Sequence, residues 1–182
     1  MKIFRMLAAL GVMASAVTAW AQFDPTVRDA GSKMRDEAIT GHEYRAAQRS
    51  AQARSQTLYH YYAQPKPIVT KEQAKEAAVA IKKDIKEADT ALAKLKKAHA
   101  KEPEVVKLIE GIEKHHAKAH EFCAMTEKEL EEESAKSETM ADCCSNAWHE
   151  LEAAKSDTDK LFKMLNIKEL EPPKKAAPAA KK

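Results

Sequence analysis

Histidine and cysteine side chains gather in the C-terminal half of the sequence. His116, His120 and Cys123 follow one another at spacings of four and three residues. On a helix with about 100° between residues, these spacings place the three side chains on one narrow stripe. Imidazole and thiolate suit Zn²⁺, and sulfur ligands select Cu(I). The pattern predicts a Cu or Zn site made of His116, His120, Cys123 and Cys144, with Cys143 in reserve.

The same cysteines allow two other interpretations. Cys123 can form a disulfide with Cys143 or Cys144 and leave one thiol free. A bridge between the adjacent Cys143 and Cys144 is disfavoured, because helix geometry would strain it. Alternatively, the thiols simply pack in the core as small apolar groups. Because oxidised sulfurs are poor ligands, the disulfide and the metal site are partly exclusive.

Several other chemistries lack the residues that they need. The sequence has no CxxCH motif for covalent haem and no glycine-rich motif for a nucleotide. Glu113 and His116 form one Glu-x-x-His, but a di-iron bundle needs a second copy. His149 is expected to point away from the core face of its helix. A helical interior also offers no obvious substrate cleft, so we expect a protein that is not an enzyme.

The composition identifies the elements that must position these side chains. Of the 182 residues, 32% are charged, 5% are aromatic and 4 are glycine, a composition typical of helices and poor in strand formers. Pro65 and Pro67 end a first helix, Thr70 caps a second and Pro103 begins a third. Apolar residues recur at alternating spacings of three and four. Four helices are predicted, over about 27–62, 71–101, 103–134 and 137–166.

The junction between the last two helices decides the fold. Residues 131–137 contain no Gly or Pro, so one long helix in an elongated coiled coil is an alternative. Thr126, Glu133 and Ser137 would weaken the seam of such a coil, and Ser137 suits a helix cap. A turn here gives four helices of similar length, which favours an all-α, up-down-up-down four-helix bundle. It also brings Cys123 and Cys144 to an offset of about four residues, or about 6 Å along the axis, which inward-pointing side chains can span.

The N-terminus has the pattern of an export signal. Lys2 and Arg5 precede an apolar stretch, and Ala19-Trp20-Ala21 fits the small-x-small rule for cleavage before Gln22. Residues 1–21 are therefore predicted to be a cleaved signal peptide. The mature protein, with its helical domain over 22–170, is expected to be exported to a periplasm or secreted. Such compartments permit disulfides.

Charge limits the classes of partner. Removing residues 1–21, which contain Lys2, Arg5 and no acid, lowers the net charge from +3 to +1, so no specific nucleic-acid binding is expected. Residues 171–182 form a Lys/Ala/Pro tail that is predicted to be disordered and able to contact anionic envelope components. The function predicted is non-enzymatic binding of a transition metal. The alternative is an envelope structural or adaptor coiled coil with an inter-helix disulfide and no metal.

Overall fold

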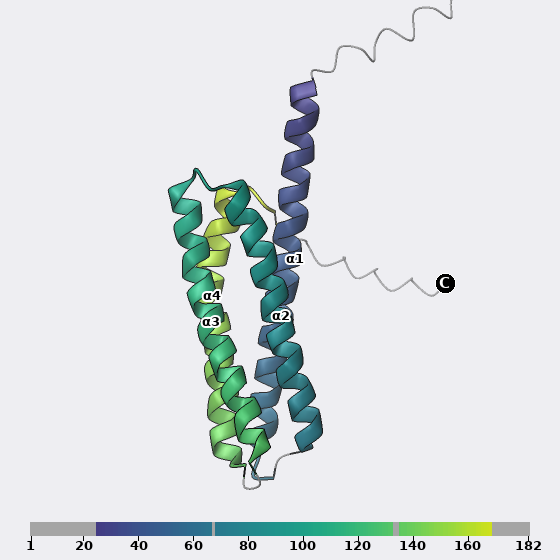
Figure 1. The fold of residues 1–182 in the computed structure, drawn as a ribbon, viewed down its shortest axis with the longest axis vertical. Coiled ribbons are helices and arrows are strands. Elements are labelled where there is room, and N and C mark those ends of the chain that lie inside the picture. The colour runs from purple at the N-terminus through teal and green to yellow at the C-terminus, as the bar shows by residue number, and fades with distance from the viewer. Residues whose placement is uncertain (1–24, 67, 133–134, 169–182) are drawn as a thin grey trace, which may run out of the picture. The chain divides into compact units, whose positions relative to one another are not determined.

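The computed structural model describes residues 25–66, 68–132 and 135–168 (Figure 1). The predicted signal peptide, 1–21, and the predicted tail, 171–182, lie outside the described residues. The chain divides into two compact units, Met1–Asp36 and Glu37–Lys182. The candidate residues all belong to the second unit, and the contacts described below lie within it.

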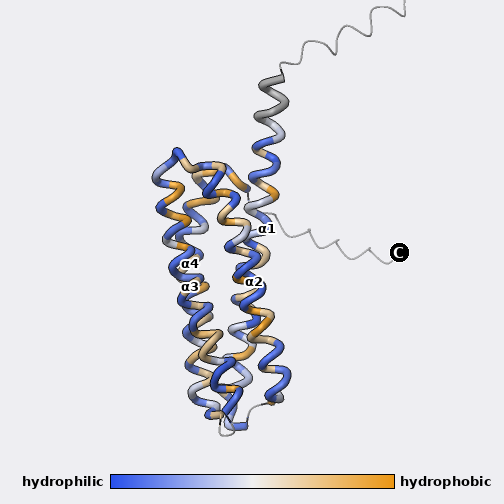
Figure 2. The backbone as a smooth tube through the Cα atoms, viewed as in Figure 1, coloured by the Kyte–Doolittle hydropathy of each residue, from blue (hydrophilic) through white to orange (hydrophobic). Residues whose placement is uncertain are grey.

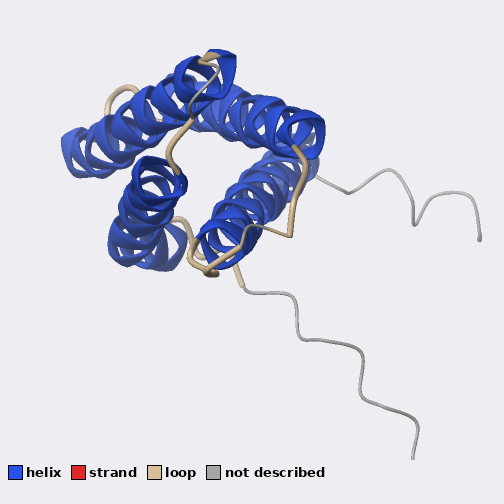
Figure 3. Ribbon diagram, turned by 90° about the horizontal axis from the view of Figure 1, so that it is seen from below, coloured by secondary structure: helices blue, strands red, loops and turns tan. Residues whose placement is uncertain are grey.

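The described residues form four helices and no strand. These are α1 (Pro25–Tyr62), α2 (Lys71–Ala98), α3 (Pro103–Glu131) and α4 (Ser137–Met164). The prediction of an all-helical, four-helix architecture is thereby confirmed for this part of the chain. Since α3 ends at Glu131 and α4 begins at Ser137, the chain turns between them, and the two helices pack side by side (Figure 3). No described helix is long and apolar enough to cross a membrane.

Cross-helix contacts show that neighbouring helices run antiparallel. In each neighbouring pair, residue numbers rise along one helix as they fall along the other. The contacts are Glu43–Lys94 and Arg54–Asp84 between α1 and α2, Lys82–Glu127 and Lys96–Glu113 between α2 and α3, Gly111–Asp157 and His115–Glu150 between α3 and α4, and Tyr44–Thr158 and Gln52–Glu152 between α1 and α4. Seen end-on, the four helices surround a common interior (Figure 3). The interior is where the seams of apolar side chains are buried.

Local sequence signals explain where the helices begin. Thr70 caps α2 in a capping box: its hydroxyl accepts from the backbone N–H of Gln73, whose side chain in turn accepts from the backbone N–H of Thr70. Pro103 is in the first turn of α3, as predicted. The predicted cap at Ser137 is wrong, because Lys136 is the capping residue of α4 and Ser137 is already helical. Here the Glu129 carboxylate accepts a hydrogen bond from the backbone N–H of Lys136 at 2.9 Å.

The core consists of two clusters of buried side chains. Apolar residues recur along each helix between polar ones, rather than in continuous runs (Figure 2). We call the cluster near the α3–α4 turn the thiol-end core; its larger members include Leu58, Ile81, Ile85, Cys123, Met140, Cys144 and Leu151. We call the other the distal core; its larger members include Tyr44, Leu92, Leu95, Ile109, Ile112, Leu161 and Phe162. Gln48 on α1 and His116 on α3 lie between the two clusters and are both buried.

Candidate functional site

Two cysteines on facing helices enter the same core cluster. Cys123 of α3 and Cys144 of α4 are each 3% exposed, and both are free thiols. Gly111 of α3 lies against Asp157 of α4; twelve residues further along α3 is Cys123, and twelve back along α4 is Ser145, the neighbour of Cys144. The antiparallel alignment thus places the two thiols at the same height. The sequence predicted an offset of about four residues between these two thiols, and the structure places them nearly level.

The surroundings of these thiols keep them protonated. Burial, the largest cause, raises the pKa of Cys123 to about 12 and that of Cys144 to about 12. A hydrogen bond with Thr126 acts in the opposite direction and lowers the pKa of Cys144. Cys143 is also buried, and burial followed by the negative charges of Asp142 and Glu129 raises its pKa. A metal that binds here must therefore displace protons from neutral thiols.

Two further buried side chains accompany the thiols: the polar Thr126 and the thioether of Met140. Thr126 is 2% exposed, and its hydroxyl donates to the carbonyl oxygen of Phe122 at 3.0 Å. Its hydroxyl also acts to lower the pKa of Cys143 and of Cys144. The thioether of Met140 is fully buried in the same cluster. A sulfur-rich core of this kind is the environment that soft metal ions select.

His116 is buried but lies apart from the thiols. Its ring is 0% exposed, and Nδ1 lies 2.6 Å from Oδ1 of Asp89 on α2. A carboxylate on one ring nitrogen is the usual support of a metal-binding histidine. Nε2 is buried without a hydrogen-bond partner among the described residues, and the ring lies 6.1 Å from that of Tyr44. Seven residues separate His116 from Cys123, or about 10 Å along the axis, so the structure does not bring them together.

His120 does not face the interior, and this corrects the predicted stripe. The side chain is exposed beside a groove of about 610 Å³ between α2 and α3, near Lys82 and Lys86. The eight buried residues of α3 centre about 30° from His116 on the side away from His120. His120 is therefore about 70° from that centre, whereas Cys123 is about 10° from it. The predicted stripe was inferred from His116, His120 and Cys123 alone. The centre of the buried face, taken over all eight buried residues of α3, lies further from His120.

The ligands of the predicted site do not converge as a set. Within residues 25–66, 68–132 and 135–168, no group of three or more His, Cys, Asp or Glu side chains is placed to hold a metal ion. The structure brings Cys123 and Cys144 into one core cluster, with the buried Cys143 beside Cys144, and leaves His116 in a separate contact with Asp89. The predicted ligands that share one region are therefore all cysteines.

Three further histidines have structural partners. His115 Nδ1 lies 2.6 Å from Glu150 Oε2, an ion pair between α3 and α4. His99 ends α2, with Nδ1 2.8 Å from Glu102 and Nε2 3.5 Å from Glu37. His149 is exposed, as predicted, and stacks on Trp148 at 4.8 Å between ring centroids. None of these residues belongs to the thiol-end core.

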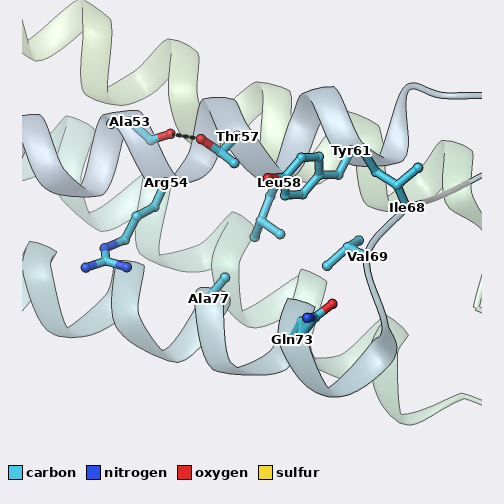
Figure 4. A pocket seen from close by; sticks show the side chains of 9 residues that line it. All are labelled: Ala53, Arg54, Thr57, Leu58, Tyr61, Ile68, Val69, Gln73 and Ala77. Atoms are coloured by element: carbon cyan, nitrogen blue, oxygen red, sulfur yellow. Dashed lines mark hydrogen bonds between the residues drawn. The ribbon is translucent and has the colours of Figure 1, made fainter.

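A surface groove between α1 and α2 is apolar and lacks converging polar groups. It measures about 540 Å³ and is lined by Leu58, Tyr61, Ile68 and Val69 near the α1–α2 turn (Figure 4). Its polar side chains are already bonded: Thr57 to the Ala53 carbonyl, Gln73 in the capping box and Arg54 to Asp84. A catalytic or ligand site needs a few polar groups aimed into the cavity. This groove does not supply them.

Comparison with known proteins leaves the thiol-end core as the main guide to function. No protein-family model, curated protein sequence or solved structure matches the chain.

Proposed function

We propose that this protein is a non-enzymatic helical bundle that binds a soft metal ion, Cu(I), through Cys123 and Cys144. The observation that carries the proposal is the pair of buried free thiols on facing helices, in a cluster that also holds Met140. Thiolate and thioether sulfur are the ligands that select Cu(I). Cu(I) also accepts two sulfur ligands, whereas structural Zn²⁺ needs four tetrahedral ligands. Because the candidate ligands are all sulfur atoms, they favour copper over zinc, the two metals that the sequence predicted.

Competition for Cu(I) tests this proposal. Residues 22–182, reduced and free of oxygen, are titrated with Cu(I) held by a coloured chelator. We expect one Cu(I) per chain, with binding lost in Cys123→Ser and in Cys144→Ser. His120→Ala is the matched control, because its side chain is exposed and should not affect binding. Unchanged stoichiometry in the Cys123→Ser/Cys144→Ser double variant would show that the site is wrong.

The alternative function, an envelope structural or adaptor protein, is supported by the same facing thiols. Oxidation of Cys123 and Cys144 would join α3 to α4 and constrain the unfolded chain. Thiol titration of protein isolated from its own compartment separates the two proposals. Three free thiols, of which Cys123 and Cys144 become protected by Cu(I), favour the metal site. One free thiol that ignores Cu(I) favours the adaptor.

We also propose that the protein is exported. The support is the charged, apolar and small-x-small pattern of residues 1–21. N-terminal sequencing of the protein expressed in a bacterium, separated into periplasm and cytoplasm, is the test. We expect a mature chain that begins at Gln22 in the periplasmic fraction; a full-length chain in the cytoplasm would contradict export.

A further inference from the structure

The charges around the thiol pair determine which ligand it accepts. From α2 and α3, the groups that influence Cys123 are Lys82 and Glu127, and these two side chains bond to each other at 2.7 Å. From α1, Tyr62 is the ionisable neighbour of Cys144. The charged groups that influence Cys143 are the acidic Asp142 and Glu129. The cation that lowers the pKa of Cys123, Lys82, is therefore already paired with Glu127.

This environment penalises a bound state with net charge. Cu(I) held by two thiolates carries one negative charge, which would lie in an apolar interior beside Met140, Ala147 and Leu151. Burying a charge that has no counter-ion costs several kcal/mol. A ligand that reacts with two neutral thiols and leaves a neutral product avoids this cost. The thiol-end core can therefore accept such a ligand without this cost, whereas bound Cu(I) must offset the cost with its metal–sulfur bonds.

We propose that Cys123 and Cys144 also bind a trivalent metalloid in its neutral hydroxide form, with arsenite as the representative. Two arsenic–oxygen bonds break and two arsenic–sulfur bonds form. Each departing hydroxide takes one thiol proton and leaves as water, and the third hydroxide stays on arsenic. The oxidation state does not change, no proton is released, and the bound species is neutral. This inference uses the sulfur pair of the proposed function but does not need its metal.

The neighbours of the pair fit this reaction. The remaining hydroxide on arsenic needs a polar partner in a dry interior. Thr126 provides one, since its side chain is buried on α3 three residues after Cys123. Cys143 lies next to Cys144, but no three of these groups converge as the helices are placed. The structure thus assigns two sulfurs to the metalloid and makes Cys143→Ser the matched control.

Arsenite binding by reduced residues 22–182 tests the inference. Elemental analysis after desalting should give one arsenic per chain, with two of the three thiols protected from a thiol reagent. Arsenite should also raise the thermal unfolding midpoint. All three readouts should be lost in Cys123→Ser and Cys144→Ser and kept in Cys143→Ser. Binding that survives the Cys123→Ser/Cys144→Ser double variant, or that is lost in Cys143→Ser, would overturn the assignment.

Dependence on pH distinguishes this inference from the copper proposal. Because no proton is released, arsenite affinity should change by less than about twofold between pH 6 and pH 8. Cu(I) affinity should fall on acidification over the same range, because each thiolate formed releases a proton. If Cu(I) binds with the expected variant pattern and arsenite does not, this inference fails and the copper proposal stands. If arsenite binds and Cu(I) does not, the copper proposal fails and this inference stands.

Discussion

His116 and His120 lie one helical turn apart on α3, yet their environments are opposite. His116 is fully buried and contacts Asp89 and Tyr44, whereas His120 is exposed at the edge of a groove. Removing a buried ring leaves a cavity and lost contacts, but removing an exposed one leaves neither. The pair therefore offers an internal comparison of core and surface histidine on the same helix.

We expect His116→Ala to lower the free energy of unfolding by about 2–4 kcal/mol, because of the cavity and the lost Asp89 contact. His120→Ala should change it by less than about 0.5 kcal/mol, since surface substitutions have small effects. Urea denaturation followed by circular dichroism measures both. Equal losses in the two variants would contradict the placement of α3.

The raised pKa values of Cys123 and Cys144 predict a loss of stability in alkali. In the unfolded chain these thiols ionise near pH 9, whereas in the folded protein they stay protonated until about pH 12. Their contribution is therefore fully present below pH 9 and is lost as pH rises toward the folded value. Each thiol should reduce the free energy of unfolding by about 1.4 kcal/mol per pH unit in this window. Denaturation at pH 8, 9 and 10 measures the slope.

The control for this pH effect is the Cys123→Ser/Cys144→Ser double variant. Its unfolding free energy should fall less steeply between pH 9 and pH 10, a range below most tyrosine ionisation. An identical slope in the variant and the parent protein would contradict the burial of these thiols.

At the scale of single residues, the sequence predicted the sulfurs of the candidate site better than its imidazoles. Cys123 and Cys144 occupy seam positions, so their burial followed from the apolar repeat. Cys143 is one residue off the seam and is nevertheless buried. The His116–Asp89 contact joins residues on different helices at a distance of 27 positions, and no local pattern indicates such a pair.

Among the helices, α2 and α3 were readily predicted, whereas the packing face of α1 was not. In α3, the residues that recur at spacings of three and four from Val105 to Leu130 are the residues buried in the structure. The buried face of α1 also repeats at spacings of three and four: Gly41, Tyr44, Gln48, Ala51, Ser55, Leu58 and Tyr62. Gly, Gln, Ala and Ser do not stand out as hydrophobic, so this face gives no clear apolar period. The burial of this α1 face depends on its packing against α2 and α4, and not on the hydropathy of its own residues.

The capping box at the start of α2 gives a prediction for this element. Thr70→Ala removes the hydroxyl that accepts from the backbone N–H of Gln73 and should lower the free energy of unfolding by about 1 kcal/mol. Thr90→Ala is the matched control. Thr90 is exposed in the middle of α2 and bonds to the Lys86 carbonyl, so alanine there should leave stability unchanged or slightly raise it. Chemical denaturation compares the two; a larger loss at Thr90 would rule out the cap.

Across the whole bundle, one buried hydrogen bond joins helices that are distant in the sequence. Thr158 donates its hydroxyl hydrogen to the Ala154 carbonyl, so the Tyr44 hydroxyl donates to Thr158 Oγ1 at 2.6 Å. A double-mutant cycle with Tyr44→Phe and Thr158→Val should give a coupling of about 0.5–1.5 kcal/mol. The exposed pair Lys83–Glu87 should couple by less than about 0.5 kcal/mol. Zero coupling for Tyr44 and Thr158 would mean that α1 and α4 do not pack in this way.

The buried polar residues between the two apolar cores also restrict how the helices can slide along one another. If α3 moved by one heptad, His116 would leave Asp89, and an aliphatic or thiol side chain would take its place. Uniform apolar seams tolerate such slips, but a seam interrupted by one matched polar contact does not. The His116–Asp89 contact thus fixes the alignment of α3 against α2. Two turns away, it fixes the height of Cys123 relative to α2, while the neighbouring His115–Glu150 contact relates α3 to α4.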